Sequence, residues 1–381
     1  MAVHDGAPFI RQALASVLEQ TFPHFELIVI DDGSTDETPV ILRDCADARL
    51  QVVRQRRSGQ LAALNRGLEL AQGEFVARQD ADDVWLPGRL AWQVQFLERH
   101  VEMGAVGAQA VIVDSADRPL AVTRLPTRPT SLRWYLLFES PFVHSAVLMR
   151  RAVLAQVGPY RTDEDIGPVA DYELWSRLGR AAPIANAPFP LVLYREHPAA
   201  MSKREAGVFA SKAPKVREAN VVAEFGDVRL ARRVAQHARV LRLQEVGAAR
   251  LSDVSDAIAT LLELEDAFFT KHERALTGDR LAAIEIRGFT AERLLVAISR
   301  VVSRPASPLA REVVGALLGH LWRLARTPQG AERAAHLMWD TLLRLTLGGS
   351  RYHASIARRA LREARRHPVN HRPRQLVAAV G

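Results

Sequence analysis

The chain of 381 residues has one cysteine, Cys45, and only four lysines among its 51 basic residues. A single cysteine excludes an internal disulfide framework and suits a reducing compartment. Long hydrophobic runs are lacking too, because no charge-free apolar stretch reaches the ~18 residues of a membrane-spanning helix. Charged residues interrupt the first forty positions, so no signal peptide is predicted. These absences favour a cytoplasmic protein.

The charge is unevenly distributed along the chain. Residues 1–200 carry 20 arginines and 25 acidic residues, a balance of −5, whereas residues 201–381 carry 31 basic and 18 acidic residues, a balance of +13. The asymmetry predicts two parts with different surfaces. The basic part could meet an anionic membrane face, although a coding preference for arginine explains the same composition. The basic residues are scattered and no nucleic-acid-binding motif is present, so we expect no nucleic acid as a partner.

The first 205 residues alternate between strand-like and helix-like segments. Short apolar runs predict strands at Phe25–Ile30, Leu50–Val53, Glu74–Arg78 and Ala105–Val113. Between them, hydrophobic residues at helical spacing predict helices, and Ser34–Glu37 has the pattern of a capping box at a helix start. This alternation predicts an α/β domain over 1–205 with a mostly parallel, Rossmann-like sheet flanked by helices.

The character of the sequence changes after residue 205. Strand-like runs vanish, and alanine, arginine and leucine dominate. We predict helices at about 216–247, 254–275, 279–302, 307–326, 330–347 and 351–366 from their hydrophobic spacing. The second predicted domain, 206–381, is therefore an all-α region.

Two acidic clusters follow predicted strands. Asp31 and Asp32 come after one strand, and Asp80, Asp82 and Asp83 come after another. Ligands of open α/β sheets bind at the carboxyl ends of the strands. A hard divalent cation such as Mg²⁺ or Mn²⁺ prefers oxygen ligands and would offset the repulsion between these carboxylates. The alternative is a solvated acidic turn, which is the more common explanation for such a motif standing alone.

Five blocks of the sequence carry a more specific signal. They are "DGAPFIRQALASVLEQTFPHFELIVIDDGSTDET", "LAALNRGLELAQGEFVARQDADDVWLPGRL", "PFVHSAVLMRRAVLAQVGPYR", "ADYELWSRL" and "YREHPAAMS". In order and spacing, from Met1 to about Ser202, the chain resembles the family 2 glycosyltransferases, inverting enzymes of the GT-A fold. The resemblance implies transfer of a sugar from a nucleotide-diphosphate-sugar, with a UDP-sugar expected first, to a saccharide or lipid-linked acceptor hydroxyl in polysaccharide biosynthesis.

The resemblance also implies roles for the acidic residues. Asp32 would meet the uracil or ribose of the donor, and Asp31 would support that turn. Asp80 and Asp82 correspond to the family's DxD pair, which binds the metal, and Asp82 is the expected direct ligand. Asp83 would contact the donor sugar or shape the loop.

Further positions match the family's motifs. Asp171 in "ADYELW" corresponds to the catalytic base. Asn65 lies on the helix that faces the donor phosphates in the family, with a purely structural role as the alternative. His144 and Ser145 correspond to the acceptor side, although a buried structural histidine is equally compatible with the sequence. His197 could approach the metal or the diphosphate.

Two departures from the family pattern affect these expectations. Only Met1–Val3 precede "HDG", where relatives carry a longer first strand, so a short first strand is expected. Ala170 stands where relatives usually have glutamate before the aspartate. A non-catalytic nucleotide-sugar-binding scaffold, which would keep Asp32 and the acidic pair, is therefore the alternative function. We expect the basic helical region to dock beside the acceptor side and to attract the protein to the inner face of the membrane.

Overall fold

The computed structural model describes residues 1–241, 251–302 and 319. These residues form two compact units. The first contains Met1–Thr127 and Ser140–Phe209, and the second contains Arg128–Glu139 together with the described residues from Ala210 onward. The second unit thus includes a helix from the first half of the chain, Pro129–Tyr135 (α5). The domain boundary at residue 205 stays a prediction.

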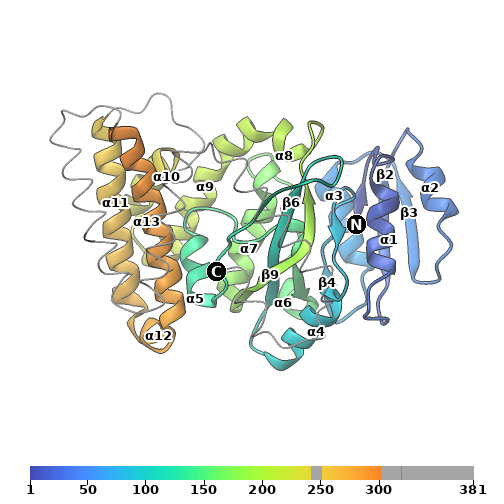
Figure 1. The fold of residues 1–381 in the computed structure, drawn as a ribbon, viewed down its shortest axis with the longest axis horizontal. Coiled ribbons are helices and arrows are strands. Elements are labelled where there is room, and N and C mark those ends of the chain that lie inside the picture. Colours follow the sequence, from blue (N-terminus) through green and yellow to red (C-terminus); the bar gives the residue numbers. More distant parts are fainter. Residues whose placement is uncertain (242–250, 303–318, 320–381) are drawn as a thin grey trace. The chain divides into compact units, whose positions relative to one another are not determined.

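The first unit contains a parallel sheet of three strands, β1 (Ala2–Val3), β2 (Leu27–Asp32) and β3 (Leu50–Gln55), in that order. Every residue of β2 is buried, since helices cover both of its faces. Side chains alternate between the faces of a strand, so Leu27 and Val29 pack with α1 (Ile10–Leu18) and α2 (Thr38–Asp44). Ile28 and Ile30 pack with α3 (Gln60–Leu70) on the opposite face (Figure 1).

The second sheet has the order β4-β8-β6-β9-β5, with β7 paired to β6. Its strands are β4 (Phe75–Ala77), β5 (Val84–Trp85), β6 (Ala105–Val113), β7 (Pro119–Val122), β8 (Leu148–Arg150) and β9 (Ile184–Arg195). The pair β6–β9 is parallel, while the other pairs are antiparallel. The predicted α/β class is confirmed, whereas these antiparallel pairings were not predicted. The remaining helices of the unit are α4 (Arg89–Arg99), η1 (His144–Ala146), α6 (Arg151–Val157), η2 (Gly167–Val169), α7 (Ala170–Ala181) and α8 (Met201–Arg204).

The short strand β1 lies where the two sheets meet. Ala2 is paired with Ile30 of β2 and also forms an isolated parallel bridge to Asp80, just beyond β4. Val3 is paired with Asp31. This register brings the carboxyl ends of β1, β2 and β4 together, and with them both acidic clusters.

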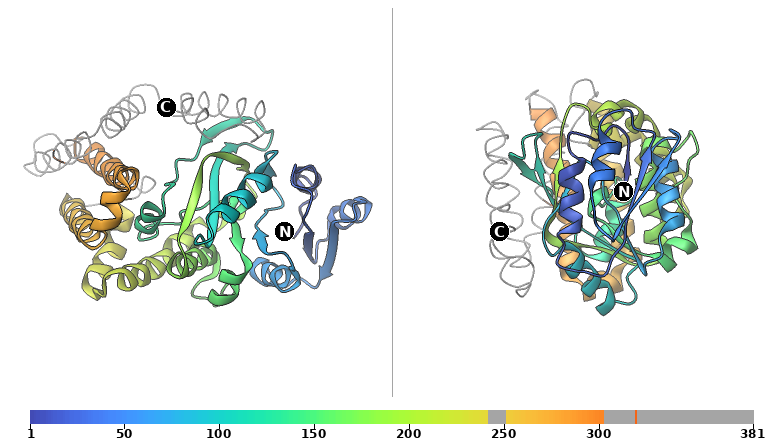
Figure 2. Two further views of the ribbon diagram at one scale, coloured as in Figure 1. Left: turned by 90° about the horizontal axis from the view of Figure 1, so that it is seen from below. Right: turned by 90° about the vertical axis from the view of Figure 1, so that its right-hand side faces the viewer.

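The second unit is helical. Its helices are α5, α9 (Ala206–Phe225), α10 (Val228–Leu241), α11 (Leu251–Lys271), α12 (Glu273–Gly278) and α13 (Arg280–Val302). The helices α11 and α13 run side by side (Figures 1 and 2). Their core includes Trp134 of α5, whose ring makes edge contacts with Phe138, Phe268 and Phe289 at centroid distances of 5.1, 5.2 and 6.2 Å.

Trp134 offers a test of this helical core. Its side chain is 1% exposed, so Trp134→Ala removes a large buried ring and leaves a cavity. We expect the substitution to lower the free energy of unfolding by about 3–5 kcal/mol, measured by urea denaturation. Trp134→Phe keeps a ring in place and should cost clearly less. Equal, small effects of both substitutions would contradict the packing of α5 in this unit.

Two details predicted from the sequence are wrong. The helix expected over 216–247 is broken, because Gly226 adopts φ +71°, a conformation that ends helices, and the Asp227 carboxylate then accepts the Leu230 N–H at 2.9 Å. The capping box at Ser34–Glu37 does not form: Ser34 accepts the Asp5 N–H instead, and α2 begins at Thr38. The helices predicted at 307–326, 330–347 and 351–366 lie outside the described residues.

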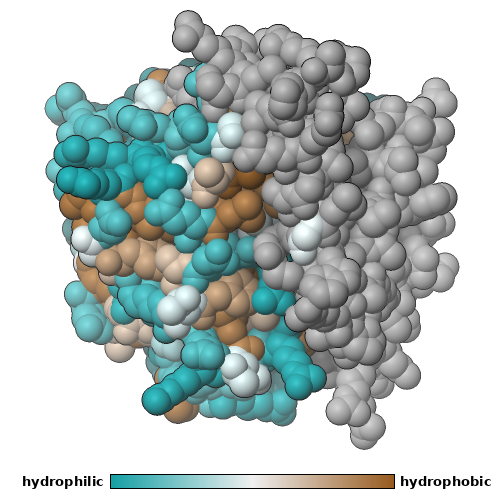
Figure 3. All heavy atoms as spheres, turned by 90° about the vertical axis from the view of Figure 1, so that its left-hand side faces the viewer, coloured by the Kyte–Doolittle hydropathy of each residue, from teal (hydrophilic) through white to brown (hydrophobic). Residues whose placement is uncertain are grey.

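One face of the helical unit carries both apolar and polar residues. Figure 3 shows hydrophobic residues lying among hydrophilic ones. Singly exposed apolar side chains such as Val228 (46%) and Leu281 (51%) are ordinary on protein surfaces. Among the helices that the structure describes, none is long and apolar enough to cross a membrane.

Candidate active site

Asp32 lies at the end of β2. Hydrogen bonds from the protein itself take most of the acceptor positions of its carboxylate. Its Oδ1 accepts hydrogen bonds from the Gln55 side chain and the Ser58 N–H, and its Oδ2 accepts one from the Gly59 N–H, each at 2.8 Å. Burial alone would raise the pKa of Asp32, but these hydrogen bonds lower it. A carboxylate has about four acceptor positions, so one, on Oδ2, is not used by these hydrogen bonds, and the residue is 3% exposed.

Two residues expected near the donor are held by contacts that shape the fold. The buried carboxylate of Asp31 accepts the Ser34 N–H at 2.9 Å and so closes the turn after β2. The amide of Asn65 donates to the Tyr160 carbonyl at 2.8 Å and accepts the Tyr160 N–H at 2.9 Å. Both ends of the Asn65 side chain are therefore used, which favours the structural alternative for this residue.

Asp80, the first acid of the DxD pair, is paired with arginine. Its Oδ1 accepts a hydrogen bond from the Arg78 guanidinium at 2.5 Å, and its Oδ2 lies 3.8 Å from Nδ1 of His144. Burial opposes ionisation and is the largest single effect, but the charge and the hydrogen bond of Arg78, with the charges of His144 and the N-terminus, together lower the pKa of Asp80. Asp80 is therefore an ionised carboxylate with a counter-ion in place.

Asp82, the second acid, faces a histidine. Its Oδ2 lies 3.0 Å from Nε2 of His197. Burial and the charge of Asp80 raise the pKa of Asp82. The 3.0 Å between Oδ2 and Nε2 is the distance of a hydrogen bond. It also equals the ~3.0 Å between neighbouring ligands of an octahedral cation with bonds of about 2.1 Å, so a cation bound by both atoms would replace the proton between them. No group of three potential ligand side chains (His, Cys, Asp or Glu) arranged to bind a metal occurs in the described part of the chain, so substrate and water would have to complete the coordination.

Asp83 and Ser145 stabilise the acidic turn through hydrogen bonds in the protein interior. Asp83 is buried, accepts the Arg195 N–H at 2.8 Å and is hydrogen-bonded to the Ser145 hydroxyl. Arg195, at the end of β9, also donates to the Asp82 carbonyl at 2.8 Å. Burial, with the charges of Asp82 and Asp80, raises the pKa of Asp83 well above its usual range. Ser145 is fully buried, so a role in shaping the loop fits better than contact with an acceptor.

His144, expected on the acceptor side, belongs to a hydrogen-bonded network beneath Asp80. Its Nε2 lies 2.8 Å from the Tyr160 hydroxyl and accepts a hydrogen bond from Nε of Arg78 at 3.1 Å. Burial and the charge of Arg78 lower the pKa of His144 to about 3. The imidazole is therefore neutral near pH 7 and poorly suited to act as a base.

Asp171 lies in the first turn of α7 and is electrostatically coupled to the same cluster. Burial raises the pKa of Asp171 to about 6, a hydrogen bond from the Tyr172 N–H opposes this, and the charge of Asp80 adds to it. The charge of Asp171 in turn contributes to the raised pKa of Tyr160. A carboxyl group with a pKa close to neutral has the value expected of a general base.

The raised pKa of Asp171 predicts a pH-dependent stability difference. Since the carboxyl ionises at about 6 in the folded chain and at ~3.9 in an unfolded one, ionisation destabilises the fold as pH rises from about 4 to 6. Asp171→Asn should therefore be more stable than the wild type above pH 6, by up to about 3 kcal/mol, and about equal at pH 4. Thermal melts at both pH values, with the exposed Asp44→Asn as control, measure this. A destabilised Asp171→Asn at pH 8 would contradict it.

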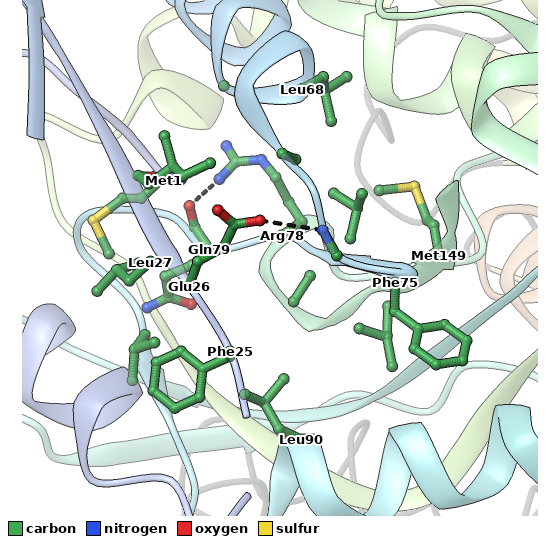
Figure 4. A pocket seen from close by; sticks show the side chains of 18 of the residues that line it. Met1, Phe25, Glu26, Leu27, Leu68, Phe75, Arg78, Gln79, Leu90 and Met149 are labelled. Atoms are coloured by element: carbon green, nitrogen blue, oxygen red, sulfur yellow. Dashed lines mark hydrogen bonds between the residues drawn. The ribbon is translucent and has the colours of Figure 1, made fainter. Parts of the chain in front are cut away.

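A cavity of about 330 Å³ lies behind the cluster, between the edges of β2 and β4. Figure 4 shows Leu27, Phe75, Leu90 and Met149 among its apolar lining. Arg78 contributes to its wall, so one side of the arginine faces the cavity and its guanidinium reaches the acidic cluster.

The sequence did not reveal three residues that organise this site. Arg78 pairs with Asp80, Tyr160 bonds to His144, and Arg195 holds the turn that carries Asp82. An arginine two residues before the acidic cluster was the available signal for the first. Tyr160 and Arg195 lie far from their partners in sequence, and only the fold brings them together.

Comparison with known proteins gives the family. Residues 1–158 match the model of glycosyl transferase family 2. The amylovoran biosynthesis glycosyltransferase AmsE of Erwinia amylovora is 30% identical over 199 residues, which cover 51% of this chain and 73% of AmsE. An uncharacterized glycosyltransferase of Haemophilus influenzae is 28% identical over 208 residues, 52% of this chain. The chain belongs to glycosyl transferase family 2, and it spans 64% of the length of the Haemophilus relative.

The similar solved structures have lower sequence identity to this chain than these relatives. S. aureus TarS (residues 1–349) is 18% identical with a TM-score of 0.49, covering 84% of this chain and 90% of that one. The mannosyltransferase PcManGT from Pyrobaculum calidifontis, solved with GDP-Man and Mn²⁺, is 20% identical with a TM-score of 0.43, covering 91% of this chain and 85% of that one. Likeness of this degree says nothing about the donor or metal of this chain.

Proposed function

We propose that the protein is an inverting glycosyltransferase that moves a hexose from a nucleotide-diphosphate-sugar to an acceptor hydroxyl. The observation that carries the proposal is the juxtaposition of two kinds of group. Asp82 and His197 stand 3.0 Å apart, while Asp80, two residues before Asp82, is electrostatically coupled to Asp171, whose pKa is raised to about 6. This transfer requires a pair of side chains able to bind a cation and a proton acceptor that interacts electrostatically with the same acidic cluster.

The reaction assigns one role to Asp171. Its ionised carboxylate accepts the proton of the acceptor hydroxyl while that oxygen attacks the anomeric carbon of the donor. The new glycosidic bond forms as the bond from the anomeric carbon to the diphosphate oxygen breaks, and the nucleoside diphosphate leaves with the electron pair. Because attack comes from the side opposite the leaving group, the anomeric configuration inverts.

The donor side rests on Asp32, Asp82 and His197. The one open acceptor position of Asp32 suits a donor N–H or O–H of the nucleoside, as in a UDP-sugar. Asp82 and His197 would hold Mg²⁺ or Mn²⁺, which when bound supplies a Lewis acid for the negative charge of the departing diphosphate. Two protein ligands suffice, because Mg²⁺ usually completes its shell with water and substrate phosphates.

The acceptor is proposed by likeness to relatives. AmsE is named for amylovoran biosynthesis, which supports a growing polysaccharide or a lipid-linked saccharide as acceptor. A peripheral position at the inner membrane face follows from the +13 balance of residues 201–381.

Activity should depend on pH through Asp171. Since the base must be ionised and its pKa is about 6, kcat/KM should rise with pH below 6 and level off above it. At pH 5 we expect about one tenth of the plateau value. A profile measured from pH 5 to 8 with saturating Mn²⁺ tests this, and a profile without an ascending limb near pH 6 would contradict the assignment.

The proposed function is tested by the release of nucleoside diphosphate. UDP-, GDP-, ADP- and dTDP-sugars are incubated with the protein and Mn²⁺, with and without EDTA, and the freed diphosphate is measured. We expect release from one donor class, abolished by EDTA. Metal-dependent binding of a donor without any release, even when saccharide acceptors are supplied, would favour the non-catalytic scaffold instead.

A further inference from the structure

The Arg78 side chain occupies a central place in the cluster. It is 5% exposed, although it follows the end of β4 directly and the nearby Asp80 and Asp82 side chains are 20% and 33% exposed. Its three nitrogens all donate hydrogen bonds: Nε to His144 at 3.1 Å, one terminal nitrogen to Asp80 at 2.5 Å, and the other to the Gln79 carbonyl. One guanidinium thus joins the acidic turn that carries Asp80 to η1.

The two acids of the DxD pair differ in their counter-ions. Asp80 has the buried Arg78 on one oxygen and His144 near the other. Asp82 is paired with His197, and no lysine or arginine lies within ion-pair distance of its carboxylate among the described residues. A divalent cation beside Asp80 would face the guanidinium at short range, where like charges repel strongly. The guanidinium nearest to Asp82, that of Arg195, donates to the Asp82 carbonyl and pairs with Asp117, so it is not bonded to the Asp82 carboxylate.

We propose that Arg78 is a positioning residue that keeps Asp80 as its counter-ion, so that Asp80 stays out of the coordination shell of the cation bound by Asp82. The inference rests on the proposed function and refines it. The sequence assigned the DxD pair to the metal with Asp82 as the expected direct ligand, and the ion pair of Arg78 with Asp80 supplies the physical reason for that difference. Arg78 also fixes His144 and, through it, Tyr160 in the wall of the site.

Removal of the arginine should therefore separate metal binding from turnover. In Arg78→Met, Asp80 loses its counter-ion and becomes available to the cation, so Mn²⁺ should bind at least threefold more tightly. The same change releases His144 and Tyr160, so kcat should fall at least tenfold. Arg78→Lys keeps the charge without the planar set of donors, and should retain the wild-type Mn²⁺ affinity with a reduced kcat. If Arg78 had only a structural role, its removal would lower the Mn²⁺ affinity and kcat together.

The experiment measures Mn²⁺ binding by electron paramagnetic resonance in the presence of UDP, GDP, ADP or dTDP, using the full chain. We expect Asp82→Asn to weaken Mn²⁺ binding at least tenfold and Asp80→Asn to change it by less than threefold. The control is Arg150→Met, which removes another largely buried arginine, one bonded to the Met103 and Leu97 carbonyls, and should leave Mn²⁺ binding unchanged. Equal losses in Asp80→Asn and Asp82→Asn would overturn the inference.

A second measurement separates this inference from the proposed function. If the wild type binds no Mn²⁺ in the presence of any of these nucleotides, the proposed function fails. The free energies of unfolding of the variants then test the Arg78–Asp80 ion pair by themselves. Breaking one side of a buried ion pair is costly, whereas removing both sides is not. Urea unfolding of Arg78→Met, Asp80→Asn and the double variant should therefore be strongly non-additive, with the double variant more stable than Arg78→Met. Additive effects would overturn the pairing on which the inference depends.

Discussion

Asp171→Asn should lower kcat by about 10²–10⁴-fold, the usual contribution of a general base. Asparagine keeps the size and most hydrogen bonds of the side chain but has no basic carboxylate. The nucleoside diphosphate and Mn²⁺ should still bind with affinities within about threefold of the wild type, since Asp82 and His197 are untouched. Initial rates of diphosphate release and titration with the nucleotide measure the two quantities.

The matched control for this variant is Asp163→Asn. Asp163 precedes the same helix, is half exposed and pairs with Arg161 on the surface. Its substitution should leave kcat within about twofold. An Asp171→Asn protein that retains turnover close to the wild type would remove Asp171 as the base. A variant that loses nucleotide binding as well would mean that Asp171 belongs to the donor site.

Asp82→Asn should abolish metal-dependent binding of the donor. The substitution takes away the carboxylate that faces His197 at 3.0 Å, and an amide oxygen is a much weaker ligand for a hard cation than a carboxylate. We expect nucleotide affinity in Mn²⁺ to fall at least tenfold, to the level that the wild type shows in EDTA. Isothermal titration with and without Mn²⁺ measures both states.

The outcome has a clear control in Asp44→Asn, an exposed acid on α2. This variant should keep the full difference between Mn²⁺ and EDTA. If Asp82→Asn keeps that difference as well, the cation is bound elsewhere. If wild-type binding and turnover do not change in EDTA, no cation takes part.

Local sequence patterns predicted the elements that carry the site. The β-branched run of β2 and the nine residues of β6 were located from composition alone, because a strand covered on both faces must be apolar along its length. These are features of short segments, and neighbouring residues determine them.

Partners distant in sequence could not be predicted in the same way. The ion pair of Arg78 with Asp80 is local, but the wall that buries it includes Tyr160 and His144, which the antiparallel pairing of β8 with β4 brings into place. The direction of that pairing depends on the whole sheet. Likewise, nothing in the sequence around Asn65 indicates that its amide bonds to the backbone of Tyr160, 95 residues away.

The central claim is that Asp82 and Asp171 serve one bound donor within one site. A crystal structure of the full chain with Mn²⁺ and the nucleoside diphosphate that it releases tests this most directly. We predict the cation within about 2.0–2.2 Å of an Asp82 oxygen, the nucleoside beside Asp32, and the Asp171 carboxylate facing the space beyond the diphosphate. A nucleotide bound away from Asp82, or one that leaves Asp171 on another surface, would contradict the account.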